Sequence, residues 1–101
     1  MTGQVIETVT FELAEGVSAE AFLSTNRALE TFLDECPGFL ARRLSKGEDG
    51  TWLDYVEWRD METATAASEA FMQRDDLKPL LESIRPDSVK MTHRVLALAK
   101  G

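Results

Sequence analysis

The sequence predicts a single α+β domain, residues 1–101, in which helices cover one face of a four-stranded antiparallel sheet. Three observations lead to this prediction. Segments with the two-residue period of a strand alternate with segments of helical period, in the order strand, helix, strand, strand, helix, strand. The middle strands are separated by a turn whose Asp49-Gly50 step is typical of a hairpin. No repeat, linker or low-complexity segment indicates a second domain.

The first half of the chain predicts one strand and one long helix. Residues 4–13 are rich in β-branched and aromatic side chains, with apolar groups on one side and polar groups on the other. Ser18 is a good N-cap for a helix over 19–36, because its hydroxyl can accept a hydrogen bond from an unpaired amide of the first turn. Pro37 and Gly38 end that helix.

The second half predicts three strands and two helices. Asp60 can cap a helix with Met61, Ala64, Ala67 and Phe71 on its inner face, and Asp75-Asp76 can cap a shorter one. The strands are expected over residues 39–46, 51–58 and 88–98, and the longer helix over about 61–73. This order of elements is that of a ferredoxin-like split β-α-β arrangement, for which we expect the strand order 4-1-3-2.

Charge and composition disfavour several classes of function. The chain carries 11 Lys and Arg against 18 Asp and Glu, a net charge of −7, so nucleic acid and anionic membranes are poor partners. Its single cysteine, Cys36, leaves no internal disulfide and no cysteine-rich zinc site. No segment approaches the ~20 apolar residues of a membrane helix, and no signal peptide is visible, so we expect a cytoplasmic protein.

The sheet face that the helices leave uncovered is expected to be an interface. Strands 51–58 and 88–98 carry large apolar side chains on both sides, for example Trp52 on one and Tyr55 on the other. Because a contiguous exposed apolar patch usually marks an interaction site, we expect a sheet-to-sheet homodimer with two-fold symmetry. The alternative is a monomer whose termini cover the sheet.

Three ionisable side chains, Glu7, Asp54 and His93, each interrupt an otherwise apolar stripe of a strand expected near the sheet centre. If all three stripes face the helices, these groups converge, because burying a charge is costly unless it is paired. We take them as candidate catalytic residues. The side chains expected around them, as a substrate-binding lining, are Trp52, Trp58, Phe11 and Met91.

Such a cluster has three interpretations. In the first, His93 is a general base oriented by one carboxylate in an aromatic-lined pocket. In the second, one histidine and two carboxylates bind iron or manganese. In the third, the groups are structural, with Arg43 or Arg94 paired to a carboxylate and a hydrogen-bonded core histidine.

Several short motifs along the chain resemble those of a known family. Pro37-Gly38-Phe39 before the second strand, Asp49-Gly50 in the hairpin, Trp58 ending the third strand and the Ala-rich helix after it resemble the antibiotic biosynthesis monooxygenase-like family. This family is a branch of the dimeric α+β barrel superfamily. The resemblance implies a homodimer with a pocket between each sheet and its helices, and a position for Trp58 near that pocket.

The resemblance also implies a class of activity. Cofactor-independent oxygenases of the superfamily act on electron-rich phenols, and their Asn, Trp, Tyr and Arg residues suggest related substrate-binding parts here for Trp52, Trp58, Tyr55 and Arg43. The Trp and His that the haem-degrading branch carries on its second helix have no counterpart, so haem degradation is not expected.

Two hypotheses about function remain open. The first is an oxygenase or isomerase that acts on an aromatic or quinone-like substrate without metal, flavin or other cofactor. The second is a non-catalytic dimeric module that binds a small apolar ligand or serves a structural role.

Overall fold

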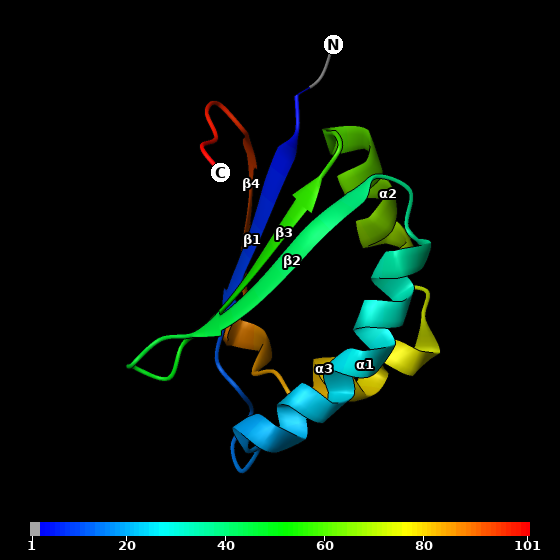
Figure 1. Ribbon diagram of the computed structural model, residues 1–101. Coiled ribbons are helices and arrows are strands. Elements are labelled where there is room, and N and C mark those ends of the chain that lie inside the picture. The colour runs from blue at the N-terminus through cyan, green and yellow to red at the C-terminus, as the bar shows by residue number, and fades with distance from the viewer. Residues whose placement is uncertain (1–2) are drawn as a thin grey trace.

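The structure is a computed structural model that describes residues 3–101. One antiparallel sheet has helices on only one of its faces (Figure 1). The elements are β1 (Val5–Phe11), α1 (Ala19–Glu35), β2 (Phe39–Lys46), β3 (Trp52–Trp58), α2 (Met61–Phe71), a 3-10 turn at Asp75–Leu77, α3 (Lys78–Glu82), a 3-10 turn at Pro86–Ser88 and β4 (Lys90–Val95). The strands lie in the order β2-β3-β1-β4, so the predicted ferredoxin-like α+β fold and strand order are confirmed.

The strand register decides which side chains share a face. Val5 of β1 lies opposite Trp58 of β3 and Val95 of β4, while Glu7 lies opposite Val56 and His93. Since side chains in a strand alternate between the two faces, the stripes that contain Glu7, Asp54 and His93 all face the helices.

α1 and α2 are capped as predicted and pack on the sheet through small and aromatic side chains. The cap predicted for the short helix at Asp75-Asp76 is wrong: these residues lie in a 3-10 turn, and α3 begins after Leu77 without a side-chain cap. The Ser18 hydroxyl accepts from the Ala21 N–H at 3.1 Å, and the Asp60 carboxylate accepts from the Thr63 N–H at 2.8 Å. Ala64 is fully buried, which brings α2 close to the sheet. The core combines aliphatic and aromatic side chains from both layers, among them Val5, Phe11, Phe22, Leu33, Val56, Trp58 and Leu77.

Gly38 turns the chain from α1 into β2. Its φ of +83° is a left-handed conformation that favours glycine, and a Cβ there would overlap the Thr63 side chain. The chain at the predicted end of α1, the Pro37-Gly38 pair, therefore also packs closely against the start of α2.

Several predicted boundaries were too long. β4 ends at Val95, opposite Val5, because its partner β1 begins there, and residues 96–98 lie beyond the strand. β1 ends at Phe11, with Leu13 in an isolated bridge to Ile84. Met61 is exposed rather than on the inner face of α2, since it starts that helix at its outer edge.

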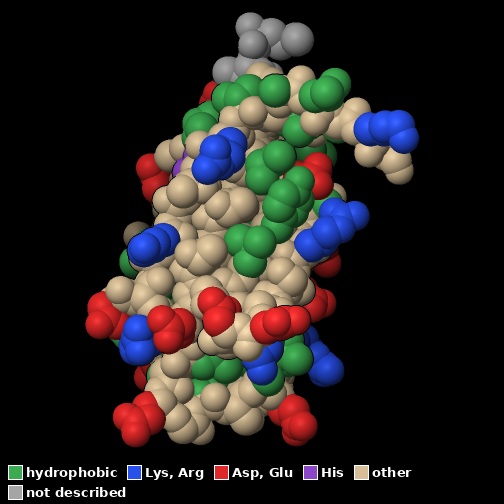
Figure 2. All heavy atoms as spheres, turned by 90° about the vertical axis from the view of Figure 1, so that its left-hand side faces the viewer, with side chains coloured by type: hydrophobic (Ala, Val, Ile, Leu, Met, Phe, Trp, Pro, Cys, Tyr) green, Lys and Arg blue, Asp and Glu red, His purple; other side chains and the backbone are tan. Residues whose placement is uncertain are grey.

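The outer face of the sheet carries side chains of mixed character. Seen from that side, hydrophobic side chains form a band flanked by Lys and Arg, with Asp and Glu gathered below (Figure 2). The outward side chains include Tyr55, the hydrogen-bonded pair Thr8 and Thr92 at 2.5 Å, and Arg43, whose guanidinium lies 3.7 Å from the Glu57 carboxylate.

Candidate functional site

A cavity of about 520 Å³ lies between the sheet and the helices. Its two walls differ in chemistry. The helix wall is apolar apart from Ser68, with Phe32 of α1, Phe71 of α2 and Leu80 of α3 among its side chains. The sheet wall adds all the ionisable groups that line the cavity, namely Glu7, Arg42 and Asp54. The helices therefore form an apolar wall of the cavity, and the strands contribute its charged side chains.

Arg42 and Asp54 form a closed pair on the sheet wall. The Arg42 guanidinium donates to both Asp54 oxygens, from Nε at 2.9 Å and from Nη2 at 2.7 Å. Nη2 also donates to Asn26 Oδ1 at 2.6 Å, and Asn26 donates in turn to the Phe22 carbonyl of α1 at 2.9 Å. Because Arg42 and Asp54 side chains are only 10% and 14% exposed, this network joins β2, β3 and α1 in a largely dry setting.

Glu7 and His93 form a second, more open pair. His93 Nε2 lies 3.0 Å from Glu7 Oε1, across the β1–β4 register. The Glu7 side chain is 14% exposed and lines the cavity, whereas His93 is 26% exposed and is not a lining residue. His93 thus stands behind Glu7, at the edge strand, with its ring partly in solvent.

Trp58 brings an unpaired donor to the same cavity. Its side chain is buried and lines the cavity, yet its indole Nε1 has no hydrogen-bond partner within residues 3–101. Buried indole N–H groups usually find an acceptor, so this one is an unsatisfied donor in the core beside the cavity.

The structure separates the predicted site residues into three groups. Glu7, Asp54, Phe11, Trp58 and Met91 line the cavity, and His93 contacts it through Glu7.

Trp52 and Arg43 lie elsewhere. Trp52 packs in the core between Phe11, at 6.5 Å between ring centroids, and Phe22, at 5.0 Å. Arg43 is 74% exposed on the outer face of the sheet, where a strand neighbour of Arg42 has to point.

Two lining or bracing residues were missed by the sequence analysis. Arg42, and not Arg43 or Arg94, makes the ion pair with Asp54. Asn26 is buried and shares the inner face of α1 with Phe22 and Leu29, at the i, i+4 and i+7 positions. An amide on an otherwise apolar helix face was the signal for a buried polar partner on the sheet.

The metal interpretation lacks a donor set in the described chain. Asp54 is turned to Arg42 and not to His93, and no group of three or more His, Cys, Asp or Glu side chains in residues 3–101 is placed to hold an ion. Cys36 lies outside the cavity, and burial raises the pKa of its thiol, with Arg74 opposing that effect. Among the described residues, no helix is long and apolar enough to cross a membrane.

No protein-family model and no curated protein matches the sequence. Solved structures do match over nearly the whole chain. A candidate antibiotic biosynthesis monooxygenase from Bordetella bronchiseptica superposes with a TM-score of 0.79 at 12% identity, covering 95% of this chain and 99% of that one.

Two further structures come from Streptomyces. The ActVA-Orf6 monooxygenase of Streptomyces coelicolor, in complex with nanaomycin D, has a TM-score of 0.74 at 16% identity, covering 98% of this chain and 91% of that one. SnoaB of Streptomyces nogalater, described as a cofactor-independent oxygenase, has a TM-score of 0.66 at 15% identity, covering 98% and 96%. The chain therefore has the fold of the antibiotic biosynthesis monooxygenase-like proteins, which its sequence resembles.

Proposed function

We propose that the cavity binds a flat, largely apolar small molecule. The observation that carries this proposal is the lining of a cavity of about 520 Å³, in which an apolar helix wall faces a sheet wall that holds Glu7, Arg42 and Asp54. Trp58 also lines the cavity, but its unpartnered Nε1 is sealed from solvent-sized molecules, so a ligand oxygen reaches it only if the indole moves.

The cavity walls suit a fused ring system. Ligand sites are typically ~300–1,000 Å³ in volume and mostly apolar, with a few convergent polar groups. Here the apolar helix wall, with Phe32 and Phe71, would cover one ring face, and the polar groups of the sheet wall would fix the orientation.

The activity that we propose is cofactor-independent oxygenation of an aromatic or quinone-like substrate. The Glu7–His93 pair would act as the base, with Glu7 facing the cavity and His93 behind it rather than as the direct base expected from the sequence. The pair would remove a phenolic proton to leave an electron-rich anion that reacts with dioxygen. Asp54 would act as a fixed charge held by Arg42. The shared fold with SnoaB and ActVA-Orf6 supports this class of reaction.

A homodimer through the outer face of the sheet is part of the proposal. The hydrophobic band in Figure 2 and the outward Tyr55 support a sheet-to-sheet contact. In sedimentation velocity, we expect the wild-type chain at twice its monomer mass and Tyr55→Glu at monomer mass. A wild-type monomer at micromolar concentration would rule the dimer out.

Function is tested with a panel of bicyclic and tricyclic hydroquinones. We expect at least one to raise the melting temperature of the protein and to be oxidised with oxygen uptake. His93→Ala should abolish the uptake, while Glu62→Gln, a carboxylate-to-amide change on the exposed side of α2, should leave it unchanged. Binding without oxygen uptake would instead identify a non-catalytic ligand-binding module. A panel that neither binds nor reacts would contradict the proposal.

A further inference from the structure

The cavity reaches solvent along one side, and its lining there is apolar. Within residues 3–101, most lining side chains are buried or half-buried, and the exposed ones all come from the segment between the end of α2 and β4. These exposed lining residues, which we call the rim, are Met72, Leu81, Pro86, Val89 and Met91. A molecule that enters past the rim therefore contacts apolar side chains before it reaches the charged groups of the sheet wall.

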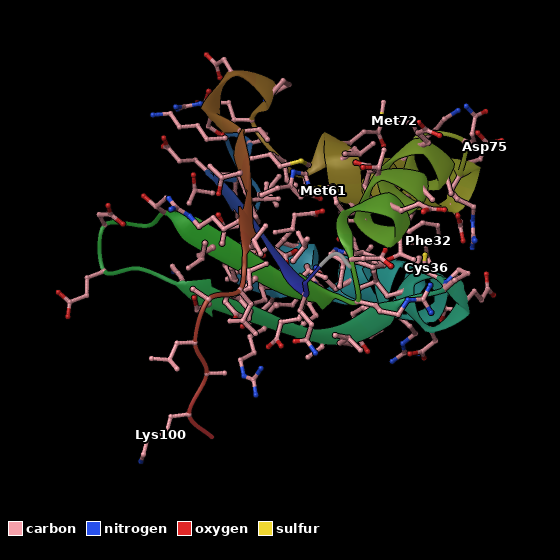
Figure 3. All side chains as sticks on the ribbon, turned by 90° about the horizontal axis from the view of Figure 1, so that it is seen from above. Phe32, Cys36, Met61, Met72, Asp75 and Lys100 are labelled. Atoms are coloured by element: carbon pink, nitrogen blue, oxygen red, sulfur yellow. The ribbon has the colours of Figure 1, made fainter. Side chains whose placement is uncertain are left out.

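Two of the rim residues are methionines, and they are the most exposed methionines among residues 3–101. Met72, at the end of α2, is 73% exposed, and Met91, on β4, is 48% exposed. Met61, which begins α2, is 37% exposed and does not line the cavity; Met61 and Met72 are both labelled in Figure 3. The chain thus offers two accessible thioethers at the cavity and a third that serves as an internal control.

An exposed methionine can be oxidised by a peroxide. The sulfur lone pair attacks one oxygen of hydrogen peroxide, the O–O bond breaks, and the second oxygen leaves as water after taking the proton of the first. The sulfur loses two electrons and the peroxide gains them, so no further reactant is needed. The product is a sulfoxide, which is polar where the thioether was apolar.

A sulfoxide on the rim would disfavour an apolar ligand. Its oxygen is a hydrogen-bond acceptor, and the rim side chains carry no donor to satisfy it, so it is hydrated. An apolar molecule that covers the rim has to remove this water. Burying a polar group with partial compensation weakens binding roughly two- to thirtyfold.

We propose that Met72 and Met91 are oxidation sites, and that their conversion to sulfoxides by a peroxide lowers the affinity of the cavity for apolar molecules. Reduction of the sulfoxides restores the affinity, so the modification is reversible. This inference rests on the proposed function, because it needs the cavity to bind an apolar molecule, and it adds a means of regulating that binding. It holds whether or not the bound molecule reacts.

The test uses N-phenyl-1-naphthylamine, a neutral dye whose fluorescence rises in apolar sites. Its dissociation constant is measured before and after mild treatment with hydrogen peroxide, and again after methionine sulfoxide reductases have acted. Peptide mass spectrometry reports which methionines have gained an oxygen atom. We expect Met72 and Met91 to be oxidised before Met61, and the dissociation constant to rise about fivefold and to recover on reduction.

Two double variants and a control separate the rim from the rest of the chain. Replacing both rim methionines by leucine keeps their apolar character and similar volume, so Met72→Leu with Met91→Leu should bind the dye normally before and after peroxide. Met72→Gln with Met91→Gln makes the rim polar and should weaken binding without any peroxide. Met61→Leu is the matched control and should respond to peroxide as wild type does. Circular dichroism checks that each variant is folded.

Each outcome bears on a different claim. If the dye does not bind the untreated protein, the proposed function fails and takes this inference with it. If the dye binds equally well when both rim methionines are oxidised, the binding proposal stands and the regulatory role of the rim is wrong. If the leucine double variant loses affinity with peroxide as wild type does, oxidation elsewhere, at Met61 or Cys36, is responsible, which also overturns the inference.

Discussion

The pairs Arg42–Asp54 and Glu7–His93 both join neighbouring strands on the helix-facing side of the sheet, yet they are built in opposite ways. Arg42–Asp54 has two direct hydrogen bonds and a third to Asn26, and it lies where β2, β3 and α1 meet. Glu7–His93 has a single contact of 3.0 Å, on the edge strand β4. One pair uses its hydrogen-bonding capacity within the protein, and the other leaves an oxygen available.

This difference predicts that the two pairs on the sheet wall of the cavity have different roles, one in stability and the other in ligand binding. A buried ion pair contributes mainly through the cost of breaking it, because the remaining charge is left without a partner. A partly exposed pair contributes little to stability and is free to change partners. We therefore expect substitutions at Arg42–Asp54 to unfold the protein and substitutions at Glu7–His93 to alter binding.

The largest effect is expected for Arg42→Met. It keeps much of the apolar stem but leaves Asp54 and Asn26 without their donor, so the free energy of unfolding should fall by about 3 kcal/mol. Arg43→Met is the matched control one residue along the same strand, where the guanidinium is 74% exposed, and should change it by less than about 0.5 kcal/mol. Urea unfolding measures both. Equal losses in the two variants would contradict the assignment of Arg42 to the buried side.

A smaller effect is expected from replacing each carboxylate by its amide. Asp54→Asn removes a charge that accepts two hydrogen bonds and should cost about 2 kcal/mol in urea unfolding. Glu7→Gln removes a single contact, to a histidine whose side chain is 26% exposed, and should cost less than about 1 kcal/mol. If Glu7→Gln were the more destabilising of the two, Glu7 would be a structural anchor and the contrast between the pairs would be reversed.

The arrangement of elements follows from the sequence because local and global signals agree. Ser18 and Asp60 cap the helices that the apolar period predicts, and strand alternation places Glu7, Asp54 and His93 on one face. The ends of the strands were harder to predict, because a strand ends where its neighbouring strand no longer pairs with it. The alternation in residues 88–98 continues past Val95, but β1 offers no residue opposite beyond its own start at Val5.

The two-residue period of a strand is not enough to predict whether Arg42 or Arg43 faces the helices. Phe39 packs on Trp58 in the core, so counting by twos from Phe39 puts Arg43 on the inner face. An irregularity in the β2–β3 register between Phe39 and Ala41 shifts the phase, and Arg42 points inward instead. A bulge of this kind moves every later side chain to the other face and leaves no clear mark in the sequence.

Partner choice was the second quantity that the sequence left open. The two-residue period of the strands predicted that Glu7, Asp54 and His93 share a face. It did not predict which of these side chains would pair with which partner. Asp54 lies on β3 next to β2 and pairs with Arg42, while Glu7 on β1 lies directly opposite His93 on β4. The three predicted residues therefore form two separate pairs, because Asp54 and Glu7 lie next to different neighbouring strands.

Trp58→Phe tests a third polar group of this region, the Trp58 indole N–H, which takes part in neither the Arg42–Asp54 nor the Glu7–His93 pair. Removing the Nε1–H relieves an unsatisfied buried donor, and the smaller ring loses packing, so the two effects oppose and the free energy of unfolding should change by less than about 1 kcal/mol. Trp52→Phe is the control, since its ring packs on Phe11 and Phe22 and its Nε1 is not a buried orphan, and it should cost about 1–2 kcal/mol. Equal losses in urea unfolding would mean that the unpaired Trp58 donor carries no penalty.

The smallest effect is expected at Asp60, a carboxylate that accepts from the Thr63 N–H at 2.8 Å and has a longer contact, of 3.5 Å, with the exposed Arg59. The Thr63 N–H and hydroxyl hold the pKa of Asp60 below its ordinary value. Because the pKa is lower in the folded state, this stabilisation is present above the unfolded-state value of about 3.9 and is lost as the pH falls through the folded-state value. Asp60→Asn keeps the capping oxygen but cannot titrate, so it should be slightly less stable than wild type near neutral pH, and this difference should close as the pH falls below about 4. Urea midpoints measured across that acid range test this expectation, and superimposable curves for the two proteins would show that the cap contributes the same stability in both charge states.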